Sequence, residues 1–255
     1  MIRVLLLMLG IGLGLSAVLA TELRMGHLRR FAPEAVPDWT APIDDPAQLG
    51  RGQADAVALP GLPVPAALGW RFARLGADGA VWDVTLNATG MEAAADLRLP
   101  PAWGVAHLDA GRGEIALTDL PPVAEGMRAG GLIRIETFDA RIDYAAPALE
   151  EASAQARWLG AELDGIALGE GEISLVSGGS GGWRAPFALT GDLVEVVGRI
   201  EGRFGQRRAV LEMTVKDAGA MPEAWKRALS RNAARGDAGW TIRREVDLGA
   251  TWPLF

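Results

Sequence analysis

The chain is poor in the residues on which most enzyme and metal chemistry depends. It has no cysteine, two histidines (His27 and His107) and one tyrosine, Tyr144, among 255 residues. Without cysteine there are no disulfides, thiol nucleophiles or thiolate metal ligands, and the composition is compatible with an oxidising compartment. A metal site would need both histidines together with carboxylates, and no short ligand spacing is present. We therefore predict no metal and no cofactor.

Basic residues are outnumbered by acidic ones. The formal net charge is −7 and the sequence pI is near 5.0. Nucleic-acid binding needs a basic surface, so we expect no nucleic-acid partner.

Catalytic patterns are also missing. The serines lie in no nucleophile-elbow context, so a Ser-His triad has no local support. His107 follows Trp103 and Gly104 on an expected strand, where a lone histidine is typically a hydrogen-bonded structural residue. The carboxylate pairs Glu150–Glu151 and Glu170/Glu172 are interpreted as solvated strand positions. We predict that the protein is not an enzyme and has no catalytic residues. A hydrolase built on a polar cluster around His107 is the catalytic alternative.

The amino terminus carries the clearest signal in the chain. Val4 to Ala20 are seventeen uncharged and almost entirely apolar residues. As a helix they cover roughly 25 Å, slightly less than a hydrocarbon core. We predict an uncleaved single-pass anchor over residues 1–25, with a cleaved secretory signal and a buried core helix as alternatives. The very short N-terminal tail favours an inner-membrane protein with the bulk of the chain in the periplasm, although Arg24, Arg29 and Arg30 follow the segment.

A proline-rich stretch follows the apolar segment. Proline lacks the amide donor of a strand ladder and favours extended geometry in the residue before it. Residues 26–66 are therefore predicted to be a linker or extended arm with one short edge strand. The prolines concerned are Pro33, Pro37, Pro42, Pro46, Pro60, Pro63 and Pro65.

Residues 67–255 are predicted to form a β-rich domain. Apolar and polar residues alternate over 82–88, 114–118, 139–144, 194–204 and 208–216, so each segment has one apolar and one wet face. Glycine-containing turns are expected at 77–79, 110–113, 130–131, 178–182 and 205–206. The short spacing favours a curved, mostly antiparallel meander over parallel βαβ units.

One helix is expected near the C-terminus, from about Pro222 to Arg235. Its apolar residues fall on one side, and Arg227, Arg231 and Arg235 recur at four-residue spacing on another.

The glycine run GGSGG at 178–182 resembles a phosphate-binding loop at first sight. Such a loop needs a helix after it, and here WRAPFAL follows, with Pro186 inside another strand pattern. We predict a hairpin turn.

The stretch WLGAELDGIALGEGEISLVSGGSGGWRAPFALTGDLVEVVGRIEG resembles the C-terminal half of the type II secretion system protein N family. Two glycine elements carry the resemblance, together with an upstream run at Ala106–Leu120. The matching residues are Gly169, Gly171, Ile173 and Leu175, then Gly191, Leu193 and Gly198, then Gly113, Ile115 and Leu117. The similarity covers roughly residues 70–248, and the wider AsmA-like group of periplasmic β-rich proteins shares the pattern.

The resemblance implies a non-catalytic accessory inner-membrane subunit of the type II protein secretion machinery, with no active-site residues. Its partners would be the inner membrane and other secretion subunits that contact exposed sheet edges. The alternative is an AsmA-like periplasmic protein that binds or transfers lipid. In that case an apolar face including Trp82, Leu86, Val196, Ile200 and Phe204 would hold phospholipid acyl chains.

Overall fold

Antiparallel pairing of consecutive strands organises most of the part of the chain that the structure describes. The computed structural model describes residues 24–31, 48–57, 64–101, 104–120, 128–143, 148–178, 181–206 and 208–247. Its elements are α2 (Met25–Phe31), β1 (Arg51–Val57), β2 (Ala66–Gly76), β3 (Gly79–Ala88), β4 (Met91–Leu99), β5 (Val105–Ala116), the 3-10 helix η3 (Leu117–Asp119), β6 (Ala129–Asp143), β7 (Ala148–Leu163), β8 (Ile166–Ser177), β9 (Gly182–Thr190), β10 (Val194–Arg203), β11 (Arg208–Asp217), α3 (Glu223–Asn232), β12 (Ala234–Gly236) and β13 (Gly239–Asp247).

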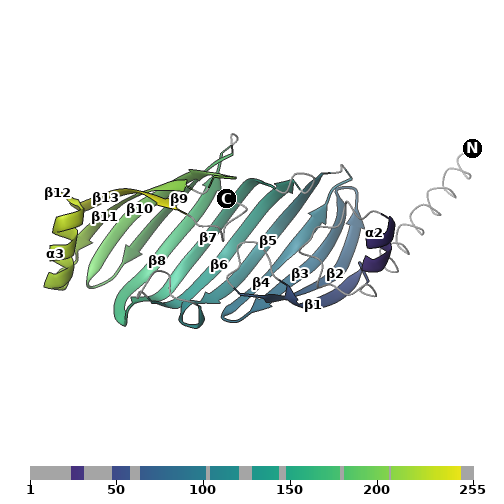
Figure 1. Cartoon of the computed structure of the whole chain (residues 1–255), viewed down its shortest axis with the longest axis horizontal. Coiled ribbons are helices and arrows are strands. Elements are labelled where there is room, and N and C mark those ends of the chain that lie inside the picture. The colour runs from purple at the N-terminus through teal and green to yellow at the C-terminus, as the bar shows by residue number, and fades with distance from the viewer. Residues whose placement is uncertain are drawn as a thin grey trace, which may run out of the picture.

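The strands form one 13-stranded sheet in which β1 to β11 are neighbours in chain order, followed by β13 and then β12. Figure 1 shows the strands inclined to the long axis of the molecule, with α2 at the β1 end and α3 at the opposite end. The prediction of a mainly β, antiparallel meander with a helix near the C-terminus is therefore confirmed. The reason is local, since connections of hairpin length leave a strand no neighbour except the preceding one.

The expected membrane-spanning helix is not among the described residues. No helix in the described part of the chain is long and apolar enough to cross a membrane, and residues 1–23 lie outside that part. The predicted anchor boundary at residue 25 falls at the start of α2. There, Met25 is buried against Ala54 and Val57 of β1. Strand β1 itself lies within the predicted linker and pairs with β2 as the first strand of the sheet.

Two glycine segments expected to be turns lie inside strands. Residues 110–113 belong to β5 and residues 130–131 to β6. Ala110 and Gly131 adopt positive φ angles of 53° and 97°, and the strand register shifts beside both. These are β-bulges, which bend a strand without ending it. Sequence alone does not distinguish a bulge from a turn, because both use the same backbone conformations.

Two other boundaries differ from expectation. The alternation predicted over 114–118 stops at Ala116, where η3 begins. Helix α3 ends at Asn232, because Ala233 is already extended (φ −134°, ψ 150°) and leads into β12. Arg235 therefore lies on a strand and not on the helix. The GGSGG hairpin is confirmed: β8 and β9 are antiparallel partners, and the Gly178 amide donates to the Gly182 carbonyl at 2.7 Å.

Candidate functional site

One face of the sheet is apolar from its first strand to β13. Successive cross-strand partners can be followed through the register of every strand pair. One row is Ala54, Leu68, Leu86, Ala93, Gly113, Ile135, Ala156, Ile173, Phe187, Gly198, Met213 and Ile242. A second is Val57, Ala66, Ala88, Met91, Ile115, Ile133, Trp158, Gly171, Leu189, Val196, Val215 and Trp240. Neither row contains a charged residue or a side-chain hydrogen-bonding group apart from the indole N–H groups.

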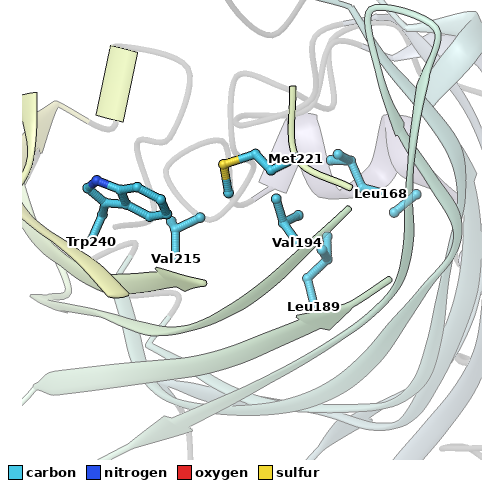
Figure 2. Packing of buried hydrophobic residues seen from close by; sticks show 7 residues of the cluster. Leu168, Leu189, Val194, Val215, Met221 and Trp240 are labelled. Atoms are coloured by element: carbon cyan, nitrogen blue, oxygen red, sulfur yellow. The ribbon is translucent and has the colours of Figure 1, made fainter. Parts of the chain in front are cut away.

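These rows lie on the concave side of the curved sheet. Figure 2 shows Leu189, Val194, Val215 and Trp240 projecting from neighbouring strands into the space around which the sheet bends. The register shifts along β5, β6 and β7 supply bulges that favour such bending. We call the concave surface that carries the two apolar rows the trough.

The trough is only partly covered. In the described part of the chain, the largest side chain with less than 2 % exposure is that of Val57. Leu86, Ile135 and Met213 are half-buried, and Ile173 in the middle of the first row is 40 % exposed. A closed β-sandwich would bury such a face beneath a second sheet. Here the middle of the first row remains accessible at Ile173, as part of a binding site for an apolar ligand would be.

Helices cover the two ends of the trough. At the β1 end, Met25 of α2 packs into a cluster with Ala54 and Val57. At the other end, Trp225 and Leu229 of α3 pack against the cluster that contains Met221, Val215 and Trp240. Among the described helices, α2 and α3 thus pack at the two ends of the sheet, and the short η3 lies beside β6. The accessible apolar surface is therefore central.

Five large rings in the trough have a glycine as a cross-strand partner, and each lies over the backbone of that glycine. A Cβ atom added at Gly202 would lie 2.6 Å from Cζ2 of the Trp183 indole, and one at Gly198 would lie 2.6 Å from Cζ of Phe187. Both distances are shorter than a van der Waals contact, so the ring occupies the place of the missing side chain. The pairs are Gly52–Trp70, Gly111–Phe138, Gly171–Trp158, Gly198–Phe187 and Gly202–Trp183. This arrangement covers the glycine backbone and keeps the rings from filling the trough.

Three indole N–H groups donate hydrogen bonds to backbone carbonyls at the rim of the trough. The Nε1 atoms of Trp70 and Trp82 donate to the carbonyls of Gln48 and Leu49 at 3.0 and 2.9 Å. Nε1 of Trp158 donates to the Gly130 carbonyl at 2.8 Å. Their polar atoms are thus satisfied by the protein, and the carbon faces of the rings are left for apolar contact.

The convex face is polar and faces solvent, and ion pairs between neighbouring strands run along it. Representative pairs are Arg71–Asp83 at 2.6 Å, Arg98–Asp109 at 2.8 Å, Arg134–Glu114 at 2.9 Å, Arg184–Glu201 at 2.7 Å and Arg199–Glu212 at 3.0 Å. The hydrogen bond to Asp109 raises the pKa of Arg98. Exposed pairs of this kind contribute little stability, but they keep one face of an extended sheet in water.

The residues considered for catalysis do not converge. His107 lies on β5 with Arg98 and Arg141 as cross-strand neighbours, and its imidazole makes no hydrogen bond or ion pair with described residues. Glu170 and Glu172 are exposed on β8, and Glu172 lies 4.0 Å from Arg157. No group of three or more potential metal ligands occurs among the described residues.

The family-like glycines have packing roles. Gly169 has φ +105°, and a Cβ atom there would lie 2.6 Å from Cα of Gly191. A Cβ atom on Gly191 would in turn lie against the Leu168 carbonyl. Close approach of two backbones requires glycine at both positions.

The sequence identified the apolar faces of single strands, but not their continuity. Trp82, Leu86, Val196 and Ile200 do lie on the face predicted for them, and Phe204 packs beside Ala140 and Trp183. The rows themselves depend on cross-strand register. Glycines that face aromatic residues in successive alternating segments are a sequence signal from which this register could be inferred.

Comparison of the chain with family models, with curated proteins and with solved structures gives no match, so the site is interpreted from its own geometry.

Proposed function

We propose that the protein binds the acyl chains of membrane lipids in the trough and acts in lipid handling. The observation that carries this proposal is the pair of unbroken apolar rows that cross the sheet on an incompletely covered concave face. This function corresponds to the lipid-handling alternative offered by the sequence.

An acyl chain suits the trough better than a polypeptide does. The backbone N–H and C=O groups of the inner strands are already paired within the sheet, and the rows offer no polar side chains. A peptide lying there would leave its own amides without partners, which costs free energy. An acyl chain has no hydrogen-bonding groups to satisfy.

The dimensions also fit lipid. Neighbouring strands are about 4.8 Å apart, so the path from β1 to β13 is roughly 50 Å. One leaflet of a bilayer is about 15 Å of hydrocarbon. The trough is therefore several acyl chains long. Burial contributes about 0.8 kcal/mol per methylene in a membrane and in an apolar protein site alike. Exchange between bilayer and trough then needs little net free energy, as lipid transfer requires.

We further propose that residues 1–25 anchor the protein in the inner membrane, with the sheet in the periplasm. Helix α2 follows the apolar run directly in the chain and lies at the β1 end of the sheet (Figure 1). An anchor there would place the β1 end of the trough beside the bilayer.

Two neighbouring valines provide a matched test. Val196 belongs to the second trough row, whereas Val197 is on the convex face and 61 % exposed. Full-length protein is reconstituted with a phosphatidylcholine that carries a photoreactive acyl chain, and adducts are mapped by mass spectrometry. We expect adducts on the trough strands, several-fold weaker labelling of Val196→Glu, and unchanged labelling of Val197→Glu, because a carboxylate is costly beside an alkyl chain.

Other outcomes overturn the proposal. Equal labelling of the two variants would show that lipid does not occupy the trough. Cross-links between residues 1–23 and the trough strands, formed without lipid, would show that the amino-terminal segment is the occupant.

An accessory role in protein secretion is a second candidate. Strand β13 pairs with β12 only at Gly239, Trp240 and Thr241, so residues 242–247 have an edge free of described strands. Such an edge can accept a partner strand. A photo-cross-linking residue at the exposed Arg243 is expected to capture inner-membrane secretion subunits in cells if this role is correct. Capture of none would remove it.

A further inference from the structure

We propose that a basic pocket at the α3 end of the trough binds the phosphate headgroup of the lipid, which makes anionic phospholipids the preferred ligands. This inference rests on the proposed function, since it assigns the headgroup of the same lipid whose acyl chains lie in the trough.

The pocket lies between α3 and the β12–β13 hairpin and has a volume of about 1220 Å³. Its basic lining residues are Lys216, Lys226, Arg227, Arg231 and Arg235, and its acidic ones are Asp217, Glu223 and Asp237. Both lysines of the chain are among them. The lining is thus net positive in a protein whose net charge is −7. A basic concave site in an acidic protein favours a negatively charged ligand.

Three of these cations are available to a ligand. Nε of Arg227 and Nε of Arg231 donate only to helix carbonyls, at 3.4 and 3.3 Å. The guanidinium of Arg235 stacks on the Trp240 ring at 5.3 Å from its centroid. No carboxylate of the described residues lies within 4.0 Å of these three side chains, in contrast to the paired arginines of the convex face.

The lysine of α3 behaves differently. Nζ of Lys226 lies 2.8 Å from Asp217 and 3.3 Å from Glu223, so its charge is already compensated. We therefore assign the anion to the three arginines, because guanidinium groups make paired hydrogen bonds to phosphate oxygens.

Trp240 joins the pocket to the trough. It ends the second apolar row beside Val215, and it also lines the pocket. Its Nε1 atom lies 3.3 Å from Oγ of Ser230, another residue of the pocket. Val215, Leu189 and Trp240 are themselves buried in the cluster that α3 covers. A ligand with its phosphate beside Arg235 would therefore extend its alkyl part past this cluster toward the exposed Ile173 in the middle of the trough. Figure 2 shows Trp240 and Val215 adjacent on the concave side.

The three arginines could bind the phosphate of a lipid headgroup or a free phosphate compound. The experiment distinguishes these two sources. Full-length protein is loaded with photoreactive phosphatidylglycerol or phosphatidylcholine of identical acyl chains, with inorganic phosphate and glycerol phosphate as competitors. The test variant is Arg227→Gln/Arg231→Gln/Arg235→Gln. The control, Arg184→Gln/Arg199→Gln/Arg208→Gln, removes the same charge from the convex face. Far-UV circular dichroism verifies that both variants fold.

We expect phosphatidylglycerol to label the wild type more strongly than phosphatidylcholine does. In the test variant the ratio of the two labelling yields should fall by about tenfold. Labelling by phosphatidylcholine should persist, and the control should behave as wild type. Equal labelling of the wild type by both lipids would overturn the headgroup site and leave the trough proposal standing. Labelling by neither lipid would overturn the trough proposal itself. Competition by inorganic phosphate without any lipid preference would assign the arginines to free phosphate and overturn the inference.

Discussion

The pairing of Trp183 with Gly202 makes a specific prediction about the free energy of unfolding. Gly202→Ala should lower it when Trp183 is present and raise it when Trp183 is replaced by alanine. Gly202 lies on β10 opposite Trp183 of β9. The atoms closest to an added Cβ at Gly202 are all in the indole: Cζ2 at 2.6 Å, Cε2 at 2.8 Å and Nε1 at 3.1 Å. Trp183 is 8 % exposed, so its ring must shift when this space is filled. We therefore compare Gly202→Ala in the wild type and in Trp183→Ala.

The expected magnitudes follow from burial. Tryptophan buries roughly 200 Å². If a displaced indole loses about a quarter of that contact, the loss is about 1.3 kcal/mol at 25 cal/mol per Å². Glycine in a strand costs roughly 0.5–1 kcal/mol relative to alanine. Gly202→Ala should then destabilise the wild type by about 0.5 kcal/mol. In the Trp183→Ala background, which itself costs about 3–5 kcal/mol, the same change should stabilise by about 0.5–1 kcal/mol.

The free energy of unfolding is measured by urea denaturation, with far-UV circular dichroism at the β-sheet minimum as the signal. This signal does not depend on the deleted indole, and the slopes of the four proteins must agree for the cycle to be valid. If Gly202→Ala destabilises both backgrounds equally, the ring is not what excludes a side chain at this position. The glycine–aromatic explanation of the open trough would then be wrong.

Three further predictions concern the α3 end and the convex face. Hydrogen bonds from Lys226 and from the amides of Gly219 and Met221 lower the pKa of Asp217 from 3.8 to about 2. The stability contributed by Asp217 is therefore present above about pH 4 and lost as the pH falls toward 2. The difference in urea midpoint between wild type and Asp217→Asn should shrink over that range; a difference independent of pH would contradict the assignment. Met221 is 4 % exposed, so Met221→Ala should cost about 2–5 kcal/mol. Hydrogen exchange should accelerate in β11 and β13 but not in β2 and β3, and uniform acceleration would show that the sheet unfolds as one unit. Asp83 makes an exposed ion pair, so Asp83→Asn should change the free energy of unfolding by less than about 1 kcal/mol. A larger loss would give the convex ion pairs a structural role.

Much of the fold follows from short-range features of the chain. Alternation of period two specifies strands, and connections of hairpin length specify antiparallel neighbours, as the GGSGG run between β8 and β9 illustrates. Strand interiors were harder to predict. Gly111 and Gly131 have the residue type of a turn, yet each lies at a bulge where the partner strand continues past it. Whether a glycine ends a strand or bends it depends on pairing with residues distant in sequence.

The candidate sites show the same division. The sequence by itself determined that each strand has one apolar and one charged face, because successive side chains must point to opposite sides of a strand. Only the tertiary structure decided that these faces join into rows, since one shift of register would break them. The tertiary structure also determined which basic residues meet in the pocket at the α3 end. Arg235, expected on the helix beside Arg227 and Arg231, lies on β12 over Trp240, and the fold brings the three arginines together from two elements. Register and contacts between elements are long-range properties, which no local pattern of residues encodes.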